Sequence, residues 1–248
     1  MSSEVPAGSR ADRLARRLGI TRALLAALRV EAESAAIGAR ARAWPPARRA
    51  LAAIRHGRGL LVNVACGPFP LDGFVNLDLR AYVAGVVPWD CRRSLPCADG
   101  ACAGIRIEHW VEHLDPRDEL PALLAACARA LAPGGVLRII VPDAGRFLAA
   151  YAAGGRGGFD ALGVPDPLPD DLPTPLDVVA HTFHQWGEHR WGFDAENLAW
   201  RLSAAGLADV TREAFGRSRL APLGADRAEH AKYSLYVEAV RPADGHHG

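Results

Sequence analysis

Two stretches of this chain combine residue types and spacing that could do chemistry. In the first, residues 61–80 (LVNVACGPFPLDGFVNLDLR), an apolar run leads into a glycine-bearing turn and a second apolar run ends at an acid. Gly67 lets the backbone approach a ligand closely, and Asp78 is placed to accept hydrogen bonds from ribose hydroxyls. We therefore expect a nucleoside to lie over this turn.

The second stretch, residues 108–114 (EHWVEHL), brings two acids and two histidines together. If this segment is helical, His109, Glu112 and His113 stand at i, i+3 and i+4 and share one face. His109, with an ordinary pKa of about 6.5, would then be a candidate general base. The same face could hold a divalent metal ion, or simply brace the pocket.

The turn ACGPFP differs from the turns that bind dinucleotides. A nicotinamide cofactor needs G-x-G-x-x-G and an acid about 20 residues later, whereas Asp78 arrives sooner. Pro68 and Pro70 also remove two backbone N–H donors that a pyrophosphate would use. A nicotinamide-dependent oxidoreductase is therefore disfavoured.

The elements that must position these residues alternate between strand and helix. Apolar runs predict five strands, at residues 60–65, 74–78, 86–88, 103–107 and 136–141. Asp115 as N-cap and Pro116 at the first helical position predict a helix that Pro133-Gly134-Gly135 ends. This order predicts a doubly wound parallel sheet, which binds its ligand at the carboxyl ends of the strands.

Five blocks in order resemble the class I S-adenosylmethionine-dependent methyltransferases, particularly the small bacterial branch called methyltransferase type 11. The blocks are LVNVACG, FVNLD, WDCRRSLPCADGACAGIRIEHWVEHL, ARALAPGGVLRIIVPD and HRWGFDAENLAWRLSAAGLADV. The resemblance implies a Rossmann-like, doubly wound, mostly parallel seven-stranded sheet. A helix over residues 194–205 and strands at 209–215 and 232–240 would complete it as an antiparallel C-terminal hairpin.

The resemblance implies that the cofactor is S-adenosyl-L-methionine. Asp78 and Leu79 would bind its ribose, and Asp90 would accept from the adenine amine. The other residues implied at the donor pocket are Ala65, Cys66, Gly67, Trp89, Cys91 and Glu108. Ala65 stands where the family usually has glycine, so either its backbone is ordinary or the pocket is altered.

The acceptor-recognition insert of this superfamily follows the fifth strand, here at about residues 152–192. Its GGRGGFDALGVPDPLPDDLPTPLD stretch predicts no regular element. Aromatic, histidine and arginine side chains suit contact with a ring or an anion, and the substrate-binding candidates are Tyr151, His184, Trp186, His189 and Arg190. The spacing of the histidines at 181, 184 and 189 fits no common zinc pattern, so we assign no metal.

The function that these features favour is methyl transfer to a small-molecule or glycan-precursor acceptor, by O- or N-methylation, with His109, Glu112 and His113 as catalytic candidates. The alternative is a non-catalytic methyltransferase-like protein that binds the donor or acts as a scaffold. An N-P-P-[YF] motif is absent and the catalytic part is acidic, which argues against a nucleic-acid acceptor.

Charge divides the 248-residue chain into a basic helical extension, residues 1–58, and a methyltransferase domain, residues 59–248. The extension holds twelve arginines against four acids, within a net charge of +1. Leucine spacing predicts helices at residues 10–30 and 47–55, separated by Pro45-Pro46. A helix over the donor pocket is the favoured role, and docking on an anionic surface is the alternative.

Cysteine usage and hydropathy indicate a cytoplasmic protein. The five cysteines lack paired C-x-x-C spacing, which favours neither a disulfide framework nor a zinc site. No apolar run approaches the roughly 18 residues of a membrane span. The sequence does not indicate the oligomeric state.

Overall fold

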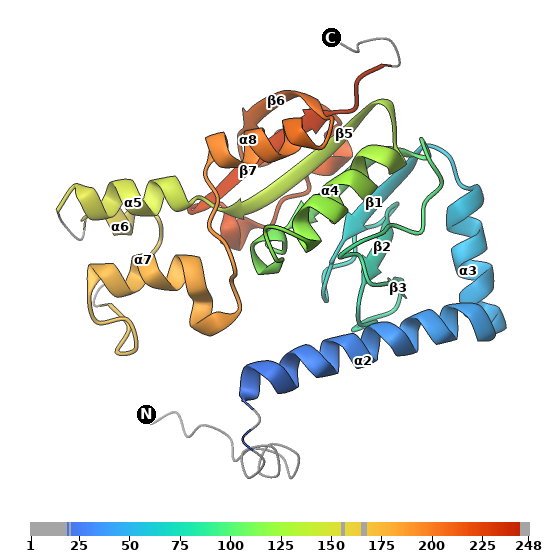
Figure 1. Ribbon diagram of the computed structural model, residues 1–248. Helices are drawn as coiled ribbons and strands as arrows, with labels where there is room; N and C mark the ends of the chain where they lie inside the picture. Colours follow the sequence, from blue (N-terminus) through green and yellow to red (C-terminus); the bar gives the residue numbers. More distant parts are fainter. Residues whose placement is uncertain (1–18, 20, 155–156, 165–167, 244–248) are drawn as a thin grey trace.

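A seven-stranded sheet in the order β3-β2-β1-β4-β5-β7-β6 forms the centre of the molecule (Figure 1). The structure is a computed structural model and describes residues 19, 21–154, 157–164 and 168–243. Its strands are β1 Leu60–Val64, β2 Val75–Asp78, β3 Val86–Pro88, β4 Cys102–Glu108, β5 Leu131–Pro142, β6 Ala208–Glu213 and β7 Ser234–Val240. Strands β1 to β5 pair in parallel, and β7 pairs antiparallel with β5 and β6. The predicted fold class is confirmed.

The central strands are apolar because both faces of the sheet are covered. Val62 pairs with Val75 of β2 and with Ile105 of β4, and Val62 and Ile105 have no exposed surface. From β1 the chain goes to β2 and β3 on one side, and then returns to β4 on the other. This reversal opens a crevice at the carboxyl ends of β1 and β4, where open α/β sheets bind ligands.

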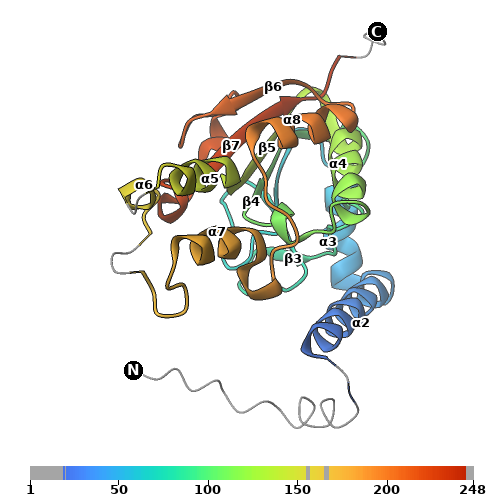
Figure 2. The same cartoon turned by 60° about the vertical axis from the view of Figure 1, so that its left-hand side comes forward.

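Helices flank the sheet and extend from its edges (Figures 1 and 2). The α-helices are α2 Arg22–Ala43, α3 Pro45–His56, α4 Glu119–Ala130, α5 Ala144–Ala152, α6 Gly157–Asp160, α7 Pro175–His184 and α8 Ala195–Ala204. The 3-10 helices are η1 Val111–His113, η2 Gln185–Gly187, η3 Ala221–Gly224 and η4 Ala228–His230. α2 runs past the β3 edge, whereas α5, α6 and α7 share a small apolar cluster of their own.

The N-terminal helices differ from the prediction. The helix predicted over residues 10–30 lies partly outside the described residues, and α2 continues to Ala43. Pro45 and Pro46 occupy the first positions of α3, so the break between the helices is the extended residue Trp44. Proline lacks the N–H that the first turn of a helix leaves unpaired, which is why the pair starts a helix here.

Two further helix starts were wrongly predicted. Asp115 accepts hydrogen bonds from the backbone of Arg117 and Asp118, which makes a turn, and α4 begins only at Glu119. Within the insert, where no regular element was expected over residues 154–177, α6 forms at Gly157–Asp160, and Thr174 and Asp177 form a capping box that starts α7. The helix after Asp194 and the C-terminal hairpin are confirmed.

A buried ion-pair network lies beneath the C-terminal hairpin. Arg138 of β5 has no exposed surface and donates to Asp226 at 3.0 and 2.5 Å and to Glu238 of β7 at 2.9 Å. Asp226 also accepts from the backbone of Gly216 and lies 3.8 Å from Arg106 of β4. The network therefore ties three strands to the loop before η4.

All five cysteines are free and buried. Within the described ranges, none of the helices has the length and hydropathy needed to cross a membrane.

Candidate functional site

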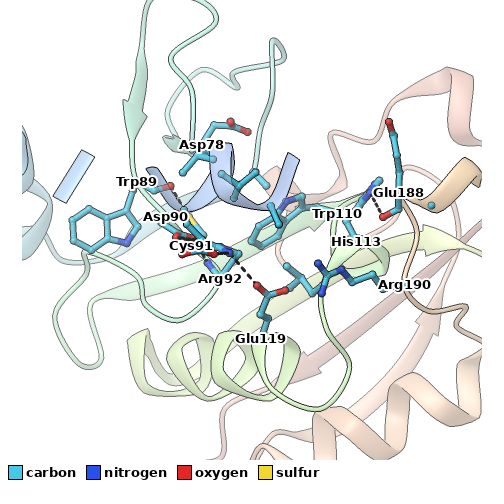
Figure 3. Close-up of a pocket in the computed structure, with 17 residues that line it drawn as sticks. Asp78, Trp89, Asp90, Cys91, Arg92, Trp110, His113, Glu119, Glu188 and Arg190 are labelled. Carbon is cyan, nitrogen blue, oxygen red and sulfur yellow. Dashed lines mark hydrogen bonds and ion pairs between the residues drawn. The ribbon is translucent and has the colours of Figure 1, made fainter. Parts of the chain in front are cut away.

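A first cavity of about 500 Å³ opens at the carboxyl ends of β1, β2 and β3 (Figure 3). Among the predicted donor-site residues, it is lined by Ala65, Asp78, Leu79, Trp89, Asp90 and Cys91. α2 contributes Ala27, Val30 and Glu31 to its wall, so the basic extension does cover this pocket. The remaining predicted donor-site residues, Cys66, Gly67 and Glu108, line a second cavity of about 190 Å³ that shares Ala65 with the first.

Asp78 is fixed at the end of β2 by two backbone donors. One carboxylate oxygen accepts from the N–H of Gly67 at 2.9 Å, and the other accepts from the N–H of Arg80 at 3.0 Å. These bonds join the end of β2 to the turn after β1. Each carboxylate oxygen has a second lone pair, so the side chain can still accept from a ligand in the first cavity.

The turn after β1 contains a strained residue. Ala65 has φ of +52°, the left-handed region in which a Cβ atom is unfavourable, and Gly67 has φ of +54°. The sequence left open whether this backbone is ordinary, and it is not. Cys66, between them, donates its N–H to Leu77 of β2, and burial raises the pKa of its thiol to about 11.

Asp90 lines the first cavity and already has partners within the protein, and its role toward an adenine amine stays a prediction. Arg92 donates to both of its carboxylate oxygens, and Ser34 of α2 donates to one of them at 2.6 Å. Although burial opposes this, the hydrogen bonds from Arg92 and Ser34 lower the pKa of Asp90. Figure 3 shows Arg92 between Asp90 and Glu119. Asp90 therefore anchors α2 to the loop after β3.

Two arginines, each paired with an acid, line the second cavity at the end of β4. Arg227 donates from Nε and Nη2 to Glu229. The Arg227 guanidinium stacks on the ring of Phe69, 3.6 Å from its centroid. Glu108 accepts from Arg106 at 2.7 Å and lies 3.3 Å from His230. Burial alone would raise the pKa of Glu108, but His230 and Arg106 together lower it to about 2.

His109 lies where the second cavity meets a third cavity of about 550 Å³. Its φ is +50°, its Nε2 lies 2.8 Å from Ser234 Oγ, and its ring lies 3.8 Å from that of His230. Burial, with His230 as a second cause, lowers its pKa to about 3, far below the ordinary value that the sequence suggested. His109 is therefore neutral at pH 7 and a weak base.

The EHWVEHL segment is not an α-helix, so the predicted shared face does not form. After His109 the chain makes the single 3-10 turn η1. Glu112 Oε1 lies 3.5 Å from His109 Nδ1, whereas His113 turns toward the carbonyl of Glu188. All three side chains nevertheless line the third cavity, together with His181, His189, His230 and Tyr233.

Glu112 is 2% exposed, and neither of its carboxylate oxygens has a hydrogen-bond partner among the described residues. Burial raises its pKa to about 8. His189 is buried beside it, with Nδ1 2.8 Å from the carbonyl of Thr182, and burial lowers its pKa. The third cavity thus places a buried carboxyl group among five imidazoles.

The predicted substrate-binding residues separate in the structure. His189 lines the third cavity, and Arg190 lines the first. His184 lines a separate cavity beside α5, Tyr151 lines a cavity at the far end of α5, and Trp186 is 70% exposed. The predicted substrate-binding residues therefore do not share one cavity, and Trp186 faces outward whereas Phe183 of α7 packs against the apolar cluster of α5, α6 and α7.

Several site residues were missed by the sequence analysis, because they come from distant segments. They are Glu31, Arg92, Glu119, Arg227, His230 and Tyr233. Arg92 had a local signal, since it follows Asp90 closely. Residues 227–233 had no local sequence signal, because only the antiparallel pairing of β7 with β5 brings them to the end of β4.

No protein-family model and no curated protein matches this chain. Solved structures do match it. A SAM dependent methyltransferase from Archaeoglobus fulgidus is 18% identical, over 94% of this chain and 100% of that one, with a TM-score of 0.45. A methyltransferase from Mesorhizobium loti is 16% identical, over 80% and 97%, with a TM-score of 0.44.

A third match is the Burkholderia thailandensis 1,6-didemethyltoxoflavin-N1-methyltransferase with bound 1,6-didemethyltoxoflavin and S-adenosylhomocysteine. It is 13% identical, over 97% of this chain and 93% of that one, with a TM-score of 0.44.

Proposed function

We propose that this protein is an S-adenosylmethionine-dependent methyltransferase acting on a small-molecule or glycan-precursor acceptor at oxygen or nitrogen. The observation that carries the proposal is Asp78. Its carboxylate is fixed by the glycine turn of β1, at the mouth of a cavity large enough for a nucleoside. A carboxylate in this position suits the two hydroxyls of a ribose.

The residues present fit such a donor along its whole length. Asp78 would hold the ribose, Trp89 and Cys91 would pack the base, and Arg227 would offer a cation to the amino-acid carboxylate in the second cavity. When bound, S-adenosylmethionine supplies a methyl group on a sulfonium. The protein's part is to align an acceptor with that methyl group, a contribution of up to roughly 7–11 kcal/mol.

The third cavity is the proposed acceptor site. His109, Glu112 and His113 line it, and His109 also lines the second cavity. Neutral His109 is held toward Ser234 and is suited to orienting an acceptor more than to removing its proton. The buried free thiols agree with a cytoplasmic location, which we carry as part of the proposal.

Calorimetric titration of S-adenosylmethionine and S-adenosylhomocysteine into the full chain tests the proposal. We expect micromolar binding that weakens at least tenfold in Asp78→Asn, since charge-assisted hydrogen bonds to a ribose are lost. Asn keeps one oxygen for the backbone of the turn, and Asp72→Ala, on the exposed loop before β2, is the matched control. Absent binding, or tighter binding of NADH, would overturn the proposal.

The alternative of a non-catalytic donor-binding protein has one observation in its favour, the strained backbone of Ala65. Production of S-adenosylhomocysteine with any acceptor excludes it. A panel of phenols, sugars and amines, assayed with wild type and with Asp78→Asn, provides that test.

A further inference from the structure

We propose that Glu112, His113 and His189 bind one divalent transition-metal ion, with Zn²⁺ as the best fit, in the wall of the third cavity. One ligand atom from each residue lies within 4.8 Å of the others. The set differs from the H-x-x-E-H face considered from sequence, because His189 of the insert takes the place of His109.

Glu112 is the first reason. It is buried, it lines the third cavity, and neither oxygen has a hydrogen-bond partner among the described residues. A carboxylate in such surroundings is costly unless a cation or a donor meets it. The arginine partners of other buried acids, such as Arg106 for Glu108, have no counterpart at Glu112 among the described residues. Its neighbour is the neutral imidazole of His109, with Nδ1 3.5 Å from Oε1.

The orientation of the two histidines is the second reason. His113 Nδ1 lies 3.1 Å from the carbonyl of Glu188, and His189 Nδ1 lies 2.8 Å from the carbonyl of Thr182. A carbonyl only accepts, so each Nδ1 carries the proton and each Nε2 keeps its lone pair. Metal-binding histidines are typically held in this way, with the second nitrogen donating to a backbone carbonyl.

The backbone holds the three residues together although they are far apart in sequence. The carbonyl of Glu112 accepts from the N–H groups of Arg190 at 2.8 Å and Trp191 at 3.3 Å. His189 therefore sits beside η1, and its ring meets that of His113 edge-on with centroids 4.8 Å apart. The cluster is thus built by main-chain contacts that do not depend on an ion.

Two imidazoles and one carboxylate are ligands typical of Zn²⁺ sites that keep an open position. Bonds of about 2.0–2.2 Å require the three side chains to close inward around the ion. The open position would face the third cavity, so an acceptor hydroxyl could bind there and lose its proton more easily. This last step rests on the proposed function, whereas binding of the ion does not.

The test is calorimetric titration of Zn²⁺ into the full chain after treatment with a chelator. We expect one equivalent to bind, and at least tenfold weaker binding in Glu112→Gln and in His189→Ala. His184→Ala is the matched control, because His184 belongs to the same segment but is exposed, and it should bind as wild type does. Co²⁺ should give visible absorption bands that the two cluster variants lose.

Absent Zn²⁺ binding, or equal affinity in wild type, Glu112→Gln and His189→Ala, would overturn the site. Equal affinity would assign the ion to surface histidines and leave Glu112 as a protonated hydrogen-bond donor. His189→Ala keeps the test valid if Glu112→Gln does not fold. S-adenosylmethionine is titrated in parallel, so failure of the proposed function appears as lost donor binding with Zn²⁺ binding intact.

Discussion

At the scale of single residues, the site concentrates unusual backbone and buried charge at the ends of β1 and β4. Ala65 and His109 both have positive φ. Ala65 lines the first and second cavities, and His109 lines the second and third. Strain of this kind persists only where the surrounding structure enforces it, and it is common at binding sites. The sequence showed that Ala65 is unusual, but it could not show which conformation the turn adopts.

Ala65→Gly should stabilise the protein. Removing a Cβ at φ of +52° relieves strain, and this gain exceeds the added chain entropy of glycine in the unfolded state. We expect the free energy of unfolding in urea to rise by about 0.5–1 kcal/mol. Ala149→Gly, at an exposed position inside α5, should instead lower it by about 1 kcal/mol. A loss of stability in Ala65→Gly would show that the Cβ packing of Ala65 outweighs its strain.

Glu108 should make stability depend on pH in the acid range. Its folded-state pKa of about 2 lies below the unfolded value of about 4.5, so its contribution is complete above pH 4.5 and is lost as the pH falls through 2. The difference in unfolding free energy between wild type and Glu108→Gln should therefore shrink by about 3 kcal/mol between pH 6 and pH 2. A difference that stays constant over this range would contradict the assigned ion pairs.

At the scale of elements, α2 borders the first cavity, whereas the C-terminal hairpin covers the buried ion pairs of Arg138. Ser34 bonds to Asp90, Glu31 to Arg92 and Glu33 to Arg80, so the middle of α2 is bound to the loops that follow β2 and β3. The sequence predicted a helix in this region because of its leucine spacing. It could not predict these partners, since each pair joins residues distant in the chain.

The fastening of α2 should govern how long a donor stays bound. The Glu31→Ala and Ser34→Ala double variant should release S-adenosylmethionine several times faster, since exposed ion pairs contribute about 0–1 kcal/mol each. Global stability should change little. Stopped-flow displacement measures the release rate, and Arg40→Ala, whose side chain stacks on Trp44 just after the end of α2, serves as control. Unchanged release would mean that α2 does not close the first cavity.

The ion pairs beneath the hairpin should contribute strongly to stability. Asp226→Ala leaves the fully buried Arg138 with an incomplete set of partners, which should cost about 3–5 kcal/mol in the free energy of unfolding. Asp171→Ala, at an exposed position of the insert, should cost less than about 0.5 kcal/mol. Equal effects of the two substitutions in urea unfolding would show that the buried network is not needed.

At the scale of the whole molecule, the sheet was predictable and the insert was not. Apolar runs bounded by glycine and proline located β1 to β4 within about one residue, because a strand covered on both faces leaves a continuous signal. Asp78 could be found for the same reason, since the end of a strand fixes its position. The start of α4 was missed, because Asp115 caps a turn and not a helix.

The third cavity could not be predicted, because tertiary contacts alone assemble it. His109 and Glu112 come from the end of β4, His181 and His189 from the insert, and His230 from η4. Sequence spacing led to a helical face for the first group, and a 3-10 turn formed instead. The chemistry of the site therefore depends on how the insert and the segment of η4 and β7 pack against β4. No local sequence pattern predicts that packing.

The most direct test of the account is a crystal structure of the full chain with S-adenosylhomocysteine. We expect ribose hydroxyls on the Asp78 carboxylate, the base beside Trp89 and Cys91, and the amino-acid end near Gly67 and Arg227. Its sulfur would then point toward His109 and the third cavity. A ligand bound elsewhere, or one whose ribose makes no contact with Asp78, would contradict the account.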